Sequence, residues 1–187
     1  MTRELLISPL LSAEACTPWT TREERLRAGT FAAPRRRAEY LTWRTLVRRR
    51  LGAGVCIAYD EIGAPVLPER REFLSVAHCP GRVVVCLCDV PCAVDVESSE
   101  RDFHRVLERV ASSGERTLST DPRWPGVLWC AKETLYKYAR HPGADFARDL
   151  RVTAVDFAGG TACGVAFGER VPLTLRFDGG FTIVSAP

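Results

Sequence analysis

Residues 129–140 read WCAKETLYKYAR and hold the only two lysines, Lys132 and Lys137, among the 26 lysines and arginines of the chain. Apolar and aromatic residues recur here close to the helical period of 3.6 residues, and His141-Pro142-Gly143 follows as a stop signal. The pattern predicts a helix. Lysine is a compact donor that can lose its proton, whereas arginine is a planar fork that stays charged, so two lysines in one short helix indicate a specific task.

One flank of this helix carries most of its chemistry. Trp129, Lys132, Glu133 and Lys137 follow one another at spacings i, i+3, i+4 and i+8, which places them on a common side. An ordinary amphipathic helix with a Glu133–Lys137 surface pair, contributing about 0.3–0.5 kcal/mol, would show the same pattern. From this helix alone both interpretations stay open.

Length and composition are those of an ordinary globular protein. The chain has 187 residues, 46% of them hydrophobic and 26% charged, with a net charge of +3. That charge is too small for a dedicated nucleic-acid binder, although it suits an acidic partner or a phosphorylated ligand. The apolar run at residues 5–11 is short and broken by a proline, so we expect no signal peptide, no membrane segment and a cytoplasmic location.

The eight cysteines are expected to be reduced thiols in that compartment. Cys86 and Cys88 alternate within the apolar run 83–88, so both face one side of a strand, and Cys92 follows shortly after. The sequence contains no C-x-x-C pair and no histidine at zinc-finger spacing. We therefore expect buried thiols in preference to a zinc site.

The rest of the chain predicts an α+β arrangement of helices and antiparallel strands. Pro34 begins a helix that runs to Leu51, a second helix spans residues 101–113, and residues 1–33 predict only one short helix. The expected strands are residues 55–59, 73–77, 83–88, 92–97, 151–157, 163–167, 173–177 and 181–185. The arginines of the first long helix form either a solvated face or an anion-binding surface, for which Arg44 is the best candidate.

Two further acids stand at the end of one predicted strand. In Ala93-Val94-Asp95-Val96-Glu97 the two carboxylates are two residues apart, so both project from the same face. They are either two solvated acids or, because like charges repel, a pair that binds a cation. Together with Glu133 they make an oxygen donor set suited to Mg²⁺, and the helix lysines beside it supply charge for phosphate groups.

This strand and this helix resemble two signature motifs of the 4'-phosphopantetheinyl transferase superfamily. Residues 93–97, AVDVE, resemble G-[IV]-D-[IVL]-E, and residues 128–137, LWCAKETLYK, resemble W-x-x-K-E-[AS]-x-x-K. Three upstream segments resemble the surfactin-synthetase-type branch: the helix segment 39–44 with Arg44, the turn Gly63-Ala64-Pro65 and the segment 76–79 with His78. The motifs occur in the family's order over about residues 34–140.

The resemblance implies an α+β fold of two pseudo-symmetric halves, residues 1–91 and 92–187, each with a small antiparallel sheet and a long helix. Coenzyme A would lie in a cleft between them. It also implies a monomeric enzyme that needs Mg²⁺ and transfers the 4'-phosphopantetheine arm of coenzyme A to a serine of an apo acyl, peptidyl or polyketide carrier protein. Neither a nucleic acid nor a membrane is expected as a partner.

Carried over residue by residue, the resemblance implies a role for each matching side chain. The metal ligands would be Asp95, Glu97 and Glu133. The groups that contact coenzyme A would be Arg44, His78, Lys132 and Lys137, of which the first two would bind its 3'-phosphate. Glu133 and Lys137 would be the catalytic residues, with Glu133 a candidate base, and Trp129 would be a packing residue.

Some positions depart from the motifs. Ala64 replaces the lysine of the turn, Ala77 replaces the serine before the loop histidine, and Ala93 replaces the glycine before the acidic pair. The first two changes remove phosphate contacts. They leave a second hypothesis, a diverged protein of the same fold that binds a carrier protein or a nucleotide without transfer. A third is a different Mg²⁺-dependent enzyme that acts on another pyrophosphate ligand.

Overall fold

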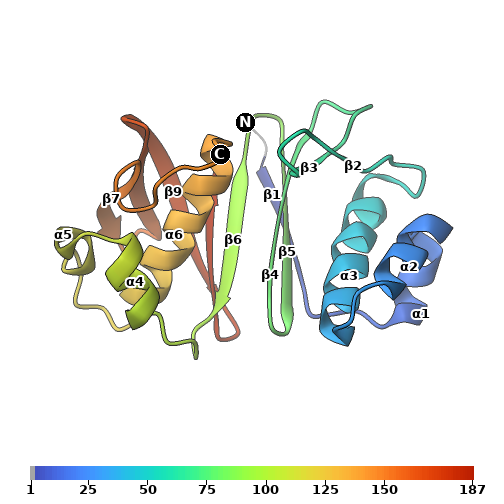
Figure 1. The fold of residues 1–187 in the computed structure, drawn as a ribbon, viewed down its shortest axis with the longest axis horizontal. Helices are drawn as coiled ribbons and strands as arrows, with labels where there is room; N and C mark the ends of the chain where they lie inside the picture. The colour runs from blue at the N-terminus through green and yellow to red at the C-terminus, as the bar shows by residue number, and fades with distance from the viewer. Residues whose placement is uncertain (1–2) are drawn as a thin grey trace. The chain divides into compact units, whose positions relative to one another are not determined.

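The computed structural model describes residues 3–187, and the chain divides between Asp89 and Val90 into two compact units. We call them the N-terminal unit and the C-terminal unit and describe each by itself (Figure 1). Both combine helices with antiparallel strands, so the predicted α+β class is confirmed. None of the helices within residues 3–187 has the length and apolar character needed to cross a lipid bilayer.

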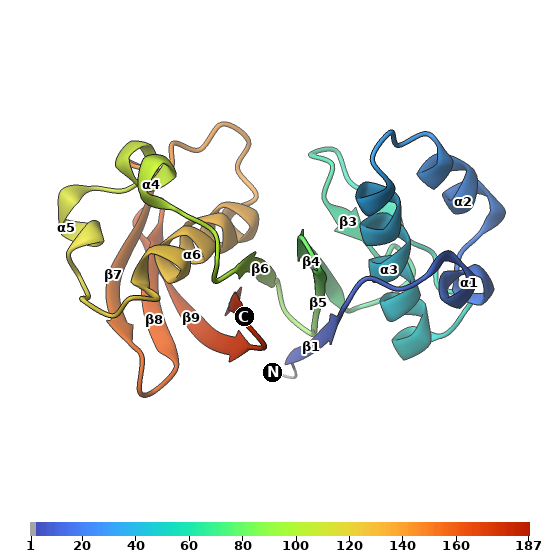
Figure 2. The ribbon, with the colours of Figure 1, turned by 90° about the horizontal axis from the view of Figure 1, so that it is seen from below.

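In the described part of the N-terminal unit, a three-stranded antiparallel sheet in the order β1-β5-β4 packs against helix α3. Its elements are α3 (Pro34–Leu51), β1 (Arg3–Ser8), β4 (Phe73–Cys79) and β5 (Arg82–Cys88). Figures 1 and 2 show α3 lying along this sheet, with α1 (Ala13–Cys16) and α2 (Arg22–Gly29) on the opposite side of α3. The 3₁₀ turn η1 (Thr17–Trp19) joins these two short helices, and β2 (Ala58–Tyr59) with β3 (Pro65–Val66) forms a separate hairpin.

The central strand β5 supplies one side of the hydrophobic core of this unit. Its alternate residues Val83, Val85 and Leu87 pack with Trp43 and Val47 of α3. The strand predicted at residues 83–88 is therefore confirmed. Its partner β1 was missed, because that strand lies in the part of the sequence that predicted only a helix.

Within the C-terminal unit the strands form one antiparallel sheet of five, in the order β6-β10-β9-β8-β7. The strands are β6 (Ala93–Ser98), β7 (Leu150–Asp156), β8 (Thr161–Ala166), β9 (Glu169–Asp178) and β10 (Phe181–Ala186). Helix α6 (Trp124–Ala139) lies across one face of the sheet, and α4 (His104–Val110) and α5 (Ser113–Arg116) precede it (Figure 2). This unit carries the longer predicted run of strands, and all four strands expected after residue 150 are present.

Close packing holds α6 on the sheet. Leu128 and Leu135 of α6 are fully buried in the core of the unit. A Cβ atom at Gly164 of β8 would come within 2.6 Å of a Leu135 methyl carbon, so a side chain there would force the buried Leu135 to shift. The helix begins at Trp124, five residues before the predicted start, and ends where Arg140 takes a left-handed conformation with φ of 51°.

Three predicted elements differ from the structure. The helix expected at residues 101–113 is divided into α4 and α5, because Ser112 begins a new helix through a capping box with Glu115. The strand expected at residues 55–59 is limited to Ala58–Tyr59. His78 and Cys79 belong to β4, although the sequence predicted a loop there.

Candidate metal and phosphate site

The three acids predicted as metal ligands lie on two adjoining elements of the C-terminal unit and repel one another electrostatically. Asp95 and Glu97 lie on β6, and Glu133 lies on α6, which packs against β6. Burial, and after it the negative charge of Asp95, raises the pKa of Glu133. Burial is also the main cause that raises the pKa of Glu97, and the charge of Asp95 adds to it. Glu97 and Glu133 are therefore costly to ionise beside Asp95.

Asp95 has one satisfied oxygen and one that is not. Lys137 Nζ lies 2.8 Å from Asp95 Oδ1 and donates a second hydrogen bond to the carbonyl oxygen of Val94 at 3.0 Å. Asp95 Oδ2 is buried, and no group within residues 3–187 makes a hydrogen bond to it. A buried carboxylate oxygen without a partner is costly, so this atom favours a cation or an ordered water at that point.

Glu97 is oriented by two neighbours. Trp129 donates a hydrogen bond from Nε1 to Glu97 Oε1 at 2.9 Å, and Arg101 forms an ion pair with the same oxygen. Trp129 was expected only to pack, and it does stack on Phe146. Its indole also holds a carboxylate, so Trp129 belongs to the candidate site.

The donor chemistry of these acids fits Mg²⁺. This ion takes oxygen ligands, is commonly held by one or two carboxylates, and keeps water and phosphate oxygens in its other positions. Within residues 3–187 no group of three or more Asp, Glu, His or Cys side chains is placed so that it could hold a metal ion, and Asp95, Glu97 and Glu133 are no exception. The observation that favours a cation here is the single buried oxygen without a hydrogen bond, Asp95 Oδ2.

Lys132 occupies a different position from the one predicted. Its side chain is fully buried and forms an ion pair with Glu115 at 2.7 Å. It also donates hydrogen bonds to the carbonyl oxygens of Phe146 at 2.8 Å and Leu150 at 2.5 Å. Because the ammonium group is held by these contacts inside the unit, we no longer propose Lys132 as a phosphate ligand. Spacing along the helix had placed it with Glu133, but its ammonium group is directed to α5 and β7.

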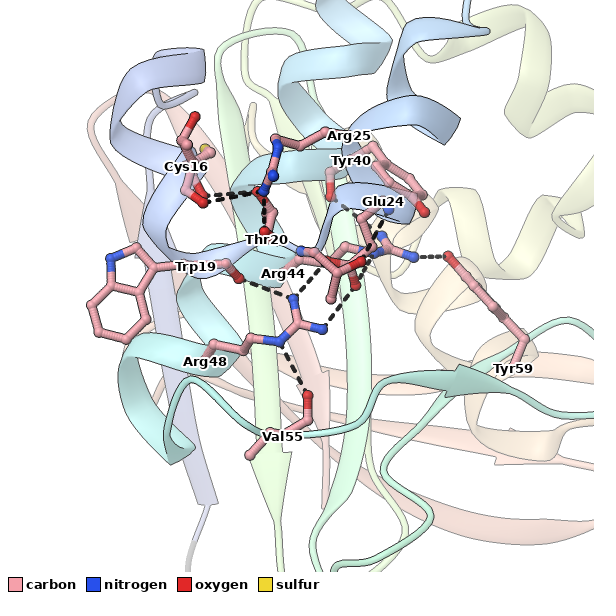
Figure 3. Close-up of polar contacts among 12 residues, drawn as sticks. Cys16, Trp19, Thr20, Glu24, Arg25, Tyr40, Arg44, Arg48, Val55 and Tyr59 are labelled. Carbon is pink, nitrogen blue, oxygen red and sulfur yellow. Dashed lines mark hydrogen bonds and ion pairs between the residues drawn. The ribbon is translucent and has the colours of Figure 1, made fainter.

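Arg44, predicted to bind a phosphate, is buried and already paired. Only 2% of this residue is exposed. Its guanidinium pairs with Glu24 at 3.2 Å, donates to the hydroxyl of Tyr59 at 2.7 Å and lies 3.5 Å from the ring centre of Tyr40 (Figure 3). Glu24 precedes Arg44 by twenty residues and lies on a separate helix, and for that reason sequence spacing did not reveal the pair. A direct contact of Arg44 with a phosphate is not supported by this arrangement.

His78 has a neighbour that the sequence did not single out. Arg36 Nη1 lies 2.6 Å from His78 Nε2, and His78 Nδ1 lies 3.3 Å from Glu39 Oε2. Arg35 also pairs with Glu39, at 3.3 Å. Glu39 is 3% exposed, so two arginines and one histidine surround a buried carboxylate. The available signal was the arginine run at residues 35–37, but the sequence does not show which of its members reaches β4.

Comparison with known proteins adds one positive finding. The family model described as the 4'-phosphopantetheinyl transferase superfamily matches residues 91–180. No curated protein gives a significant match to the chain. The matched region lies within the C-terminal unit and contains β6, α6 and the three coupled acids. Over this region the chain is similar to the 4'-phosphopantetheinyl transferase superfamily.

Proposed function

We propose that this protein transfers the 4'-phosphopantetheine arm of coenzyme A to a serine hydroxyl of an apo acyl, peptidyl or polyketide carrier protein. One observation supports this most strongly. The family region contains three coupled acids, Asp95, Glu97 and Glu133, with the ammonium group of Lys137 beside Asp95. The order of the upstream segments supports a place in the surfactin-synthetase-type branch.

In this proposal Asp95, Glu97 and Glu133 would hold Mg²⁺. When bound, the ion supplies positive charge to the pyrophosphate of coenzyme A. The other tasks fall to side chains of the protein. Lys137 keeps 30% of its side chain exposed next to the acids, where it can neutralise a phosphate oxygen.

Glu133 is the proposed general base. The serine hydroxyl of the carrier attacks the phosphorus atom that bears the pantetheine arm, and adenosine 3',5'-bisphosphate leaves. Glu133 would take the proton of that hydroxyl. Burial and the charge of Asp95 raise the pKa of Glu133, which favours proton acceptance by a carboxylate oxygen that does not hold the ion.

For the 3'-phosphate of coenzyme A we propose His78 together with Arg36. These side chains lie close together in the N-terminal unit, and Arg36 keeps 54% of its side chain exposed. Arg36 therefore takes the role first expected of Arg44. Ala64 and Ala77 lack the polar groups of the family's motifs, so the arginines of this region would have to supply the remaining charge.

The decisive experiment is transfer to a carrier. Incubation with coenzyme A, Mg²⁺ and a panel of apo carrier proteins should add the mass of one phosphopantetheine group to at least one carrier. Mass spectrometry reads this directly, and Asp95→Asn should abolish it. If coenzyme A binds but no carrier is modified, the transferase proposal is rejected.

A second candidate is a protein of the same fold that binds without transfer. Ala64 and Ala77 favour it, because both remove a polar group from the proposed nucleotide side. This version predicts that a carrier protein binds equally well with and without Mg²⁺. Titration calorimetry under both conditions, combined with the mass assay, separates the two candidates.

A further inference from the structure

The N-terminal unit contains a buried ion network that the proposed chemistry does not use. Arg44 and Arg48 of α3 are 2% and 4% exposed. Glu24 of α2 lies between them (Figure 3). Its Oε1 accepts from Arg44 Nε at 3.2 Å and from Arg48 Nη2 at 2.9 Å, and its Oε2 accepts from Arg48 Nη1 at 2.6 Å. Fork-shaped contacts of this kind are strong and fix geometry.

Each member of the network is also held by a second contact. Glu24 completes a capping box with Thr21 at the start of α2, which restrains its carboxylate. Arg48 donates to the carbonyl oxygen of Trp19 at 3.0 Å and to that of Val55 at 3.1 Å. The network therefore connects α2, η1, α3 and the chain that leads into β2.

Arg44 extends the network to the hairpin of β2 and β3. Its guanidinium lies 3.5 Å from the ring centre of Tyr40 and 3.9 Å from that of Trp43, so it has little freedom to move. Its Nη2 donates to the hydroxyl of Tyr59 at 2.7 Å. Tyr59 is the last residue of β2, immediately before the turn. The guanidinium of Arg44 thus holds the end of β2 from which the turn begins.

The turn at residues 60–64 is held by hydrogen bonds within itself, but its side chains are largely exposed. Asp60 Oδ1 accepts from the backbone amides of Ile62 at 3.0 Å and Ala64 at 2.9 Å, and the Asp60 amide donates to the carbonyl oxygen of Ala64 at 3.0 Å. Tyr59 is 51% exposed and Ile62 46%. A stiff turn with few buried side chains moves as one body, so its place depends on the anchors at its base.

We propose that Arg44 is a positioning residue: held by Glu24, it fixes the β2–β3 hairpin through Tyr59 and so sets the place of the Gly63-Ala64-Pro65 turn. The choice of coenzyme A as the ligand of that turn, which would contact it through backbone groups because Ala64 has no side-chain donor, rests on the proposed function, whereas the anchoring rests on the contacts alone. Arg44 then affects coenzyme A without touching it. This accounts for a motif arginine that is buried and already paired.

Tyr59→Phe tests the anchor, because it removes one hydroxyl from a half-exposed side chain and leaves the ring in place. Hydrogen exchange of the amides in residues 58–66 should become roughly tenfold faster, since a hydrogen bond to a charged group is lost. Tyr40→Phe is the matched control: it keeps the ring on Arg44 and should leave the exchange unchanged. If Tyr59→Phe exchanges like the wild type in this segment, the anchoring is refuted.

Calorimetry then tests the link to the ligand. Tyr59→Phe should raise the Kd for coenzyme A by roughly five- to tenfold, as expected for a misplaced binding turn. The kcat for transfer at saturating coenzyme A should stay within about twofold, because the C-terminal acids are untouched. Arg44→Lys, which keeps the charge but loses the fork, should move both measurements in the same direction.

The outcomes separate this inference from the proposed function. Faster exchange with an unchanged Kd for coenzyme A would overturn the positioning role. Wild-type protein that binds coenzyme A but modifies no carrier would reject the transferase, while the exchange rates and the Kd would still decide on Arg44. Faster exchange together with a higher Kd supports the inference in either case.

Discussion

Glu24 in the N-terminal unit and Asp95 in the C-terminal unit are both largely buried carboxylates, but their surroundings differ. Glu24 accepts hydrogen bonds from two guanidinium groups and from the backbone of Thr21. Asp95 has Lys137 on one oxygen, while its other oxygen has no hydrogen bond from the described residues. A satisfied carboxylate ties elements together, whereas one with an unmet oxygen is suited to a ligand.

The pKa directions follow the same division. Burial alone would raise the pKa of Glu24, but hydrogen bonds from Arg48 and Thr21 outweigh it and lower the pKa. Glu115, paired with Lys132, likewise has a lowered pKa despite its burial. Glu97 and Glu133 shift upward, since burial and the charge of Asp95 prevail there. Acids whose pKa is raised by burial and a specific neighbour are candidates for function.

The largest expected effect comes from the acids with raised pKa. Glu133→Gln should lower kcat for transfer by about 10²–10⁴-fold, the usual contribution of a general base. Because it removes a charge that repels Asp95, it should not lower the free energy of unfolding. Steady-state kinetics and urea unfolding measure the two effects. Glu169→Gln, an exposed acid on β9, is the control, and a loss below about fivefold in Glu133→Gln would contradict the role of base.

The buried ion pair of Lys132 with Glu115 should respond in the opposite way, with a loss of stability. Lys132→Met leaves Glu115 charged and buried, and should lower the free energy of unfolding by about 3–5 kcal/mol. Adding Glu115→Gln should recover part of this loss, because the uncompensated charge is removed. Urea denaturation of the single and double variants gives these values. If Lys132→Met lowers the free energy of unfolding by less than about 1 kcal/mol, the buried ion pair of Lys132 with Glu115 does not stabilise the fold.

Magnesium should distinguish Asp95 from Glu24 without any activity assay. A ligand at ten times its Kd stabilises the folded state by about 1.4 kcal/mol, so Mg²⁺ should raise the Tm of the wild type, and EDTA should reverse the shift. Asp95→Asn should lose this shift, and Glu24→Gln should keep it. An equal Mg²⁺ response in Asp95→Asn and the wild type would mean that the ion binds elsewhere.

The smallest effect is a dependence of stability on pH. Since the pKa of Glu24 is lowered below its ordinary value of 4.5, its contribution is complete above pH 4.5 and is lost as the pH falls through the lowered value. Glu24→Gln should therefore lose less stability than the wild type between pH 4.5 and lower pH. Urea midpoints across this range measure it, with the exposed-acid variant Glu108→Gln as the control. Parallel curves for wild type and Glu24→Gln would show that Glu24 does not carry this dependence.

Elements with local signals could be predicted from the residues alone. The periodicity of α3 and α6 and the apolar run of β5 predicted these elements, because each reports burial along a single helix or strand. The D-x-E pair and the helix motif also predicted the acids Asp95, Glu97 and Glu133, whose charges influence one another in the C-terminal unit. Both motifs are short and lie on regular elements.

Which charged side chains can reach a ligand depends on contacts between distant segments. Lys132 and Lys137 share one helix, but the first is enclosed by α5 and β7 and the second reaches Asp95. Arg44 is closed off by a glutamate from another helix, while Arg36 reaches His78 across 42 positions of sequence. The physical reason is that the partner of a charged side chain is set by packing between distant segments, which residue spacing along one element does not encode.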